Sequence, residues 1–230
     1  MNRMEFEAAP VIIYLSCNIL SAGLICIDSR EELIMTHTNN FSLYDDIQCR
    51  YFKKPGPKNT RAVMEIVSAR AEDLGIKTFL VATNSGRTAF EALEVLGPGK
   101  KIIAVSHVTG FLEPNHQELS QDTRQELEYK GIRVLTCQHA FGGIGRAVRI
   151  KLSTYQIDEI IAFTLRTFGQ GTKVAIELAL MAADAGFIRT DEDVISIGGT
   201  GKGADTALVL QPANSFRFFD LKVKEIICKP

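Results

Sequence analysis

The strongest constraint on the fold is a repeated order of short apolar run, turn and helix. Residues 78–82 form an apolar, β-rich run of the length that a buried strand needs, and residues 88–96 repeat apolar side chains at helical spacing. The turn between them, residues 84–87 (NSGR), holds small and polar residues. Strands that alternate with helices predict an α/β fold, with a mostly parallel sheet, helices on both faces and right-handed crossovers.

The same order continues to the end of the chain. Further strands are predicted at residues 101–106, 132–136, 193–197, 207–210 and 218–228, the last of them at an edge of the sheet. Helices are predicted from a cap at Asn59 or Thr60 to Gly75, and at residues 119–129, 155–168 and 172–185. Residues 137–149 (CQHAFGGIGRAVR) carry three glycines and are predicted to form a loop.

The most regular helical pattern lies in residues 155–168. Its positions at i, i+3, i+4 and i+7 spacing are Ile157, Ile160, Ile161, Thr164, Leu165 and Phe168. This spacing predicts an amphipathic helix, whose apolar stripe normally faces the core.

Composition limits the classes of function. The 230 residues are 46% apolar, enough to bury one large core or two small ones. Lysine and arginine number 26 against 27 acidic residues, so the basic surface that nucleic acid or an anionic membrane requires is not expected. The five cysteines are scattered, without a CxxC pair or zinc-ligand spacing, and are predicted to be reduced thiols of a cytoplasmic protein.

The first fifty residues differ from the rest. Residues 8–27 carry no charge, which is long enough for a membrane span. Proline, asparagine, serine and glycine interrupt this run and two glutamates precede it, so two strands or a loose extension are favoured over a span. Translation that starts later, for instance at Met35, is a further alternative. Residues 28–50 are polar and are predicted to be a surface linker.

The turn at residues 84–87 is the first candidate binding site. A strand that leads into a helix through such a turn directs free amides and the positive end of the helix dipole at one point, which suits a phosphate or carboxylate. Gly86 would allow close approach, Ser85 and Thr88 offer hydroxyls, and Arg87 offers a charge. The alternative is that Ser85 merely caps the helix.

Other glycine-bearing loops follow predicted strands and would gather at the same rim of a parallel sheet. The further binding residues predicted there are His107, Gly110, His139, Gly143, Gly145, Arg146, Thr200, Gly201, Asp205 and Thr206. Asp205 is the candidate for hydrogen bonds to ribityl, ribose or sugar hydroxyls. Each loop alone could instead be a plain hairpin or a strand-to-helix connection.

Few side chains are candidates for catalysis. His107 and His139 follow predicted strands and could donate to a ligand or act as acid or base, although loop histidines are more often hydrogen-bonded turn residues. Cys137 is a weak thiol candidate. Glu177 and Asp184 are predicted to have an exposed or cap-bonded role rather than a catalytic one.

Two common nucleotide motifs are incomplete. In GGTGKG, the first glycine of a P-loop would fall at Ser196, and Gly203 follows Lys202 where Ser or Thr is required. In GGIGRAV, Val148 takes the place of the last glycine of a dinucleotide fingerprint. A P-loop nucleotidase and a standard Rossmann dehydrogenase are therefore poor candidates.

The string NTRAVMEIVSARAEDLGIKTFLVATNSGRTAFEALEVL at residues 59–96, followed by KIIAVS, resembles the C-terminal α/β domain of pyruvate kinase. The wider series from YFKKPGPKNT through SHVTGF, GGIGR and MAADAGFI to GGTGKGADTALVLQPA resembles stand-alone archaeal and bacterial proteins built on that domain. It covers residues 51–230, so residues 1–50 are interpreted as an N-terminal extension outside the family domain.

The resemblance implies a three-layer α/β/α sandwich. It implies a phosphate site at Thr83, Asn84, Ser85, Gly86 and Thr88, because the matching loop of allosteric pyruvate kinases holds a phosphate of the sugar bisphosphate effector. Arg87 lies at a variable position of that loop. The stand-alone family is associated with flavin mononucleotide (FMN), and kinase activity is not implied because the catalytic barrel is absent.

A phosphorylated small molecule, most plausibly FMN, is therefore the expected ligand. The alternative is a flavin-dependent oxidoreductase or a phosphoester-processing enzyme that uses His107 or His139. A homo-oligomer is a further expectation, since pyruvate kinase domains of this kind join through their edges.

Overall fold

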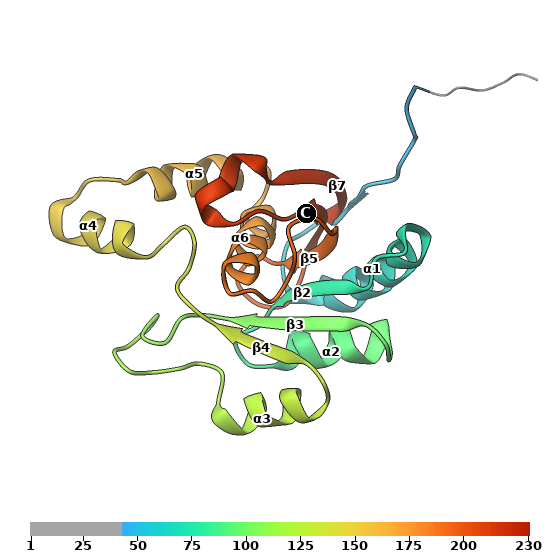
Figure 1. Cartoon of the computed structure of the whole chain (residues 1–230), viewed down its shortest axis with the longest axis horizontal. Helices are drawn as coiled ribbons and strands as arrows, with labels where there is room; N and C mark the ends of the chain where they lie inside the picture. The colour runs from blue at the N-terminus through green and yellow to red at the C-terminus, as the bar shows by residue number, and fades with distance from the viewer. Residues whose placement is uncertain (1–42) are drawn as a thin grey trace, which may run out of the picture. The chain divides into compact units, whose positions relative to one another are not determined.

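The computed structural model describes residues 43–230 (Figure 1). The uncharged run at residues 8–27, Cys17, Cys26 and Met35 lie outside the described residues, so the predictions for them stay predictions. Within the described part of the chain, every helix falls short of the length and apolarity that a membrane crossing requires.

Strands and helices alternate as the sequence predicts. The strands are β1 (Arg50–Tyr51), β2 (Thr78–Ala82), β3 (Lys101–Ser106), β4 (Arg133–Thr136), β5 (Val194–Gly198), β6 (Thr206–Gln211) and β7 (Lys222–Lys229). The α-helices are α1 (Thr60–Leu74), α2 (Arg87–Leu96), α3 (Gln121–Tyr129), α4 (Ile144–Leu152), α5 (Ile157–Arg166) and α6 (Gln170–Asp184). Short 3-10 helices are η1 (Pro57–Asn59) and η2 (Ser215–Asp220).

The strands form one mixed sheet in the order β1-β7-β6-β5-β2-β3-β4. β2 pairs in parallel with both β3 and β5, and β3 pairs in parallel with β4. β6 runs antiparallel to β5 and β7. The mostly parallel α/β fold is therefore confirmed. The predicted edge position of the last strand is wrong, because the two residues of β1 pair with the outer side of β7.

Two separate apolar clusters cover the two faces of the sheet, which confirms the three-layer arrangement. Successive strand residues point to opposite faces, so Phe79 and Val81 join α1 and α2 on one face while Leu80 joins α6 on the other. The α1–α2 face also takes Val63, Met64, Val67, Ala89, Ala92, Ile102, Ala104, Ile195 and Ile197. The α6 face also takes Ile103, Val105, Ala175, Ala179, Met181, Leu208 and Leu210.

One predicted loop contains a helix. α4 occupies the second half of residues 137–149 and continues to Leu152. The glycines predicted a loop there, but Gly143 only precedes the helix and Gly145 is accommodated within it. Ser153 ends α4 in a left-handed conformation at φ 53°. Figure 1 shows α4 (yellow) farthest out, with α5 next to it and α6 beside the sheet.

The sheet and α6 approach each other closely at Gly198, the last residue of β5. A Cβ at this position would lie 2.5 Å from the carbonyl oxygen of Gly171 and 3.0 Å from the amide nitrogen of Ala175. Nearby, the Ser196 hydroxyl donates to the Ala175 carbonyl at 2.7 Å. The first turns of α6 are thus fixed against the carboxyl end of β5.

We expect Gly198→Ala to lower the free energy of unfolding by roughly 1–3 kcal/mol, because the added methyl group would meet rigid backbone. Urea unfolding would measure the loss. Gly142→Ala is the matched control, since a Cβ there would meet only the guanidinium of Arg146, at 3.0 Å, at the end of a flexible side chain. Equal urea midpoints for Gly198→Ala and Gly142→Ala would contradict the close approach of Gly198 to the backbone of α6.

Candidate functional site

A cleft lies at the rim where β2, β3 and β5 end. It encloses about 560 Å³, within the range of roughly 300–1,000 Å³ that is usual for small-molecule sites. Its lining comes from the turn after β2, the loop after β3, the loop after β5 and the start of α6. The lining residues are Ala82, Thr83, Asn84, Ser85, Arg87, Thr88, His107, Phe111, Glu118, Gln170, Val174, Gly199, Gly201, Lys202 and Gly203.

The turn after β2 leaves the start of α2 open. Gly86 is the N-cap residue at φ 82°, and no side chain caps the helix, so the alternative of a capping Ser85 is wrong. The first bond of the helix runs from the Phe90 amide to the Gly86 carbonyl at 3.0 Å. The preceding amides of residues 87–89 have no partner within the helix, as is general for a first turn.

Gly86 itself is required for a reason that the sequence did not predict. Its φ of 82° favours glycine. In addition, a Cβ on it would lie 2.4 Å from Cγ2 of Thr123 in α3 and 3.3 Å from the Phe90 ring. The close approach at Gly86 is thus to a neighbouring helix, and the residue does not line the cleft.

Thr83, the first residue after β2, has an unusual hydroxyl. Its amide donates to the Val105 carbonyl at 3.0 Å, which fixes the backbone beside β3. The residue is only 4% exposed and lines the cleft, yet its Oγ1 atom has no hydrogen-bond partner. A buried hydroxyl without a partner is costly, so Oγ1 of Thr83 is an unsatisfied polar atom beside the cleft.

His107 is held on both ring nitrogens. Nδ1 lies 2.6 Å from Oε2 of Glu118, and Nε2 lies 3.4 Å from Nδ2 of Asn84. An amide NH₂ can only donate, so Asn84 requires a lone pair on Nε2, and the ring proton is then on Nδ1, directed at Glu118. The carboxylate of Glu118 thereby orients the imidazole at the wall of the cleft.

His139 lies behind His107 and does not line the cleft. The two rings are 5.2 Å apart, and Phe111 stacks on His139 at 5.2 Å and an interplanar angle of 15°. Nε2 of His139 accepts from the Val108 amide at 3.3 Å. Burial, the largest influence, lowers the pKa of His139 to about 4. The ring is therefore neutral at physiological pH and has a structural contact.

Glu177 anchors a buried polar cluster beneath His139. Its Oε1 accepts from the Phe141 amide at 3.0 Å, its Oε2 contacts the Lys173 ammonium, and the same oxygen lies 3.9 Å from Nδ1 of His139. Burial lowers the pKa of Lys173. The predicted exposed or cap-bonded role of Glu177 is wrong, because α6 is covered on nearly all sides. Asp184 does have the predicted role, since it accepts from the Ser215 amide at 2.9 Å.

The opposite wall of the cleft is the hairpin between β5 and β6. Gly199, Gly201, Lys202 and Gly203 line it, and Lys202 is exposed at the mouth. Asp205 lies below this hairpin, fully buried.

Asp205 is an internal anchor and not a ligand for sugar hydroxyls. Its Oδ2 accepts from the amides of Gly56 at 2.9 Å and Thr200 at 3.1 Å, and its Oδ1 accepts from the Thr206 hydroxyl at 2.9 Å. The predicted binding role of Asp205 is therefore wrong, because the tertiary fold uses the carboxylate to fix two loops. Thr200 and Thr206 serve the same anchor and do not line the cleft.

The remaining predicted residues divide into two groups. Arg146 joins the aromatic group, with its guanidinium 5.2 Å from the centroid of Phe111. Gly110 is exposed, and Gly143 and Gly145 belong to the start of α4, so none of these three lines the cleft. Cys137 is partly buried, and burial raises the pKa of its thiol, which disfavours a nucleophilic thiolate.

Among residues 43–230, no three metal-ligating side chains gather at one point.

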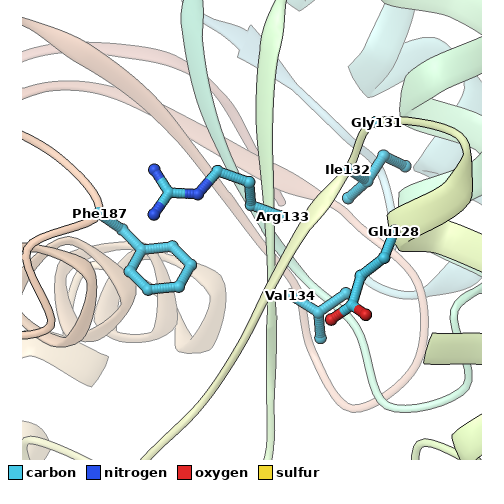
Figure 2. A pocket seen from close by; sticks show the side chains of 6 residues that line it. All are labelled: Glu128, Gly131, Ile132, Arg133, Val134 and Phe187. Carbon is cyan, nitrogen blue, oxygen red and sulfur yellow. The ribbon is translucent and has the colours of Figure 1, made fainter. Parts of the chain in front are cut away.

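A second pocket, at the edge strand β4, has different chemistry. Figure 2 shows Arg133 extending over the ring of Phe187, with Glu128 on the other side of the strand. The guanidinium carbon lies 4.0 Å from the centroid of that ring, and the pocket encloses about 400 Å³. No residue predicted from the sequence lines it. The cleft at the ends of β2, β3 and β5, which we name the Asn84–Lys202 cleft after two of its lining residues, has converging polar groups. It is thus the stronger candidate for a binding site.

Comparison with known proteins identifies the family. Residues 61–210, well over half of the chain, match the family described as pyruvate kinase, alpha/beta domain. The chain belongs to the pyruvate kinase alpha/beta domain family. The resemblance that the sequence indicated is confirmed.

Two solved structures of Cryptosporidium parvum pyruvate kinase are also similar to this chain. One has 15% identity and a TM-score of 0.31 over 63% of this chain and 21% of that chain. The other has 14% identity and a TM-score of 0.34 over 65% of this chain and 22% of that chain. The chain thus spans about a fifth of the length of each of these two pyruvate kinases.

Sequence reasoning missed several residues of the cleft in this pyruvate kinase alpha/beta domain. Lys202 was considered only as part of an incomplete P-loop, although its glycine-rich context was a usable signal. Glu118 and Gln170 gave no signal, because each reaches the cleft from a segment whose path depends on the tertiary fold.

The buried His139 predicts a pH dependence of stability. Its pKa falls from an ordinary 6.5 to about 4 on folding, so the unfolded chain binds more protons between these values. Stability is therefore complete above about pH 6.5 and falls as the pH drops towards 4, by up to about 3 kcal/mol. Urea midpoints at pH 7 and pH 5 would measure this.

We expect His139→Gln to flatten this dependence, because glutamine does not titrate. His116→Gln is the control, since that side chain is exposed, and it should keep the slope of the original protein. An equal slope in all three proteins would contradict the assignment to His139.

Proposed function

We propose that this chain binds a phosphorylated small molecule in the Asn84–Lys202 cleft, with the phosphate at the start of α2. The observation that carries the proposal is the Thr83 hydroxyl, which is buried at the wall of the cleft without a partner. A phosphate oxygen would supply the missing acceptor, and a bond to a charged group is stronger than a neutral one.

The surrounding groups support an anion at this point. The amides at the start of α2 have no side-chain cap, and a helix start favours negative charge. Ser85 and Thr88 add hydroxyls, while Arg87 and Lys202 line the cleft from opposite walls and offer cations. The only carboxylate among the lining residues belongs to Glu118, which His107 already engages at 2.6 Å.

FMN is the specific ligand that we propose. The phosphate-binding turn would hold its phosphate, and His107 and Phe111, whose rings lie 4.1 Å apart, offer an aromatic wall for a flat ring system. The family resemblance supports the same ligand. The roomy lining of small residues at Gly199, Gly201 and Gly203 is compatible with a ligand of this size. We further propose a cytoplasmic setting, supported by the dispersed thiols.

Thr83→Val tests the phosphate site, because valine has nearly the same shape as threonine but lacks the hydroxyl. We expect the dissociation constant for FMN, measured by quenching of flavin fluorescence, to rise roughly 10–100-fold, the equivalent of one hydrogen bond to a charged group. The stability of the free protein should not fall, because the hydroxyl has no partner to lose.

Thr172→Val is the matched control. Thr172 is another buried threonine, but its hydroxyl donates to the Phe168 carbonyl at 3.2 Å. It should lose about 1 kcal/mol of stability and keep its affinity for FMN. Equal FMN affinity in the original protein and Thr83→Val, or no binding of FMN or inorganic phosphate at millimolar concentration, would refute the proposal.

A second candidate function is enzymatic, and the hydrogen bond between Nδ1 of His107 and Glu118 favours it. A carboxylate that fixes the tautomer of a histidine at a cleft wall is a common arrangement for a general base. Bound flavin would supply reversible acceptance of a hydride, which suits an oxidoreductase. Phosphoester processing is the other activity that a base beside a phosphate site could serve.

His107→Asn would separate binding from catalysis. If the chain is an enzyme, this variant should lose most of its turnover, measured as NAD(P)H oxidation with an acceptor or as phosphoester hydrolysis, while FMN binding persists. Glu118→Gln should lose less, because it only orients the ring. His116→Asn is the control. Unchanged turnover after replacement of both His107 and His139 would exclude their catalytic role.

A further inference from the structure

Helix α5 exposes much of the apolar stripe that its sequence predicts to be buried. Ala162 packs into the core, whereas Ile157 and Ile160 of the predicted stripe are 71% and 50% exposed. Phe163, which is outside that stripe, is 52% exposed. These three residues follow i, i+3 and i+6 spacing and so form one row along the helix surface. An apolar row of this kind in an otherwise amphipathic helix indicates a missing partner.

Helix α4 strengthens this indication. None of its nine residues is buried, and Ile144 and Leu152 are largely exposed. Isolated helices of this length are marginal in water, so α4 needs more packing than α5 alone provides. Tyr155, between the two helices, lies edge-on to Phe163 at 5.6 Å and connects the linker to the row on α5. We name the exposed apolar residues of the two packed helices and their linker the α4–α5 face: Ile144, Leu152, Tyr155, Ile157, Ile160 and Phe163.

We infer that the α4–α5 face is the surface through which two copies of this chain associate. Its six side chains, each about half or more exposed, offer on the order of 600 Å² of apolar area. A standard interface buries roughly 800 Å² per partner, of which about 60% is apolar. The face therefore supplies the apolar area that one side of a stable dimer needs.

The charges beside the face help to decide its partner. Nε of Arg149 pairs with Oε1 of Glu159 at 2.7 Å, and the guanidinium lies 5.7 Å from the ring of Tyr155. This pair adds no net charge to the face, while Arg166, whose guanidinium lies 5.1 Å from the centroid of Phe163, adds one positive charge. An anionic membrane is a weaker match, because the whole chain has a net charge of −1. A small ligand is also a weaker match, because these six residues line neither the Asn84–Lys202 cleft nor the pocket at β4.

The test is the molar mass of the full chain by light scattering and sedimentation equilibrium at micromolar concentration. The expected mass is twice that of one chain. Replacing both Ile157 and Phe163 by glutamate (Ile157→Glu with Phe163→Glu) should raise the dimer dissociation constant at least 100-fold, because four carboxylates would be buried without partners. Tyr129→Glu, at a tyrosine of α3 that is 92% exposed, is the matched control and should stay dimeric.

Circular dichroism would establish that the double variant is folded. Hydrogen exchange of the unaltered chain gives a second measurement that requires no variant. On dilution to monomer, amides of residues 144–168 should exchange faster, and those of α1 should not. A monomeric unaltered chain, a double variant that stays dimeric, or vesicle binding that the double variant abolishes would each overturn the inference.

Discussion

The rim of the sheet depends on the parallel pairing of β2 with both β3 and β5. Three carboxyl ends then point the same way, so the turn after β2 lies between the loops that follow its neighbours. The contact of Gly198 with Gly171 draws the start of α6 to the same place and adds Gln170 and Val174 to the cleft. The cleft is thus a consequence of strand order and close helix packing, and no single loop creates it.

Polar groups near the rim fall into two kinds. Asp205 and Glu177 are buried carboxylates whose oxygens accept from loop amides, and Asp205 in particular joins Gly56 to the β5–β6 hairpin. Such bonds hold the walls in place. The Thr83 hydroxyl and the amides at the start of α2 lack comparable partners. A rigid outer shell around unsatisfied inner donors is the arrangement that a preorganised binding site requires.

Sequence patterns predicted most elements because burial imposes a period on them. The alternation of Phe79, Leu80 and Val81 between two apolar clusters follows from the pleat of a strand that helices cover on both sides. The same reasoning missed α4, because glycines near its start resembled a loop. It also predicted a core-facing stripe on α5, and a periodic stripe cannot distinguish burial within one chain from exposure to a partner.

The sequence by itself determined the order and type of most elements, with α4 and β1 as exceptions, and also the family and the turn at the start of α2. Only the tertiary structure decided which polar side chains face the cleft. Glu118 pairs with His107 across a loop, Asp205 is buried beneath its hairpin, and His139 lies behind the wall. The physical reason is that local patterns record which positions are apolar, whereas a polar side chain acquires its role from the segments that packing brings against it.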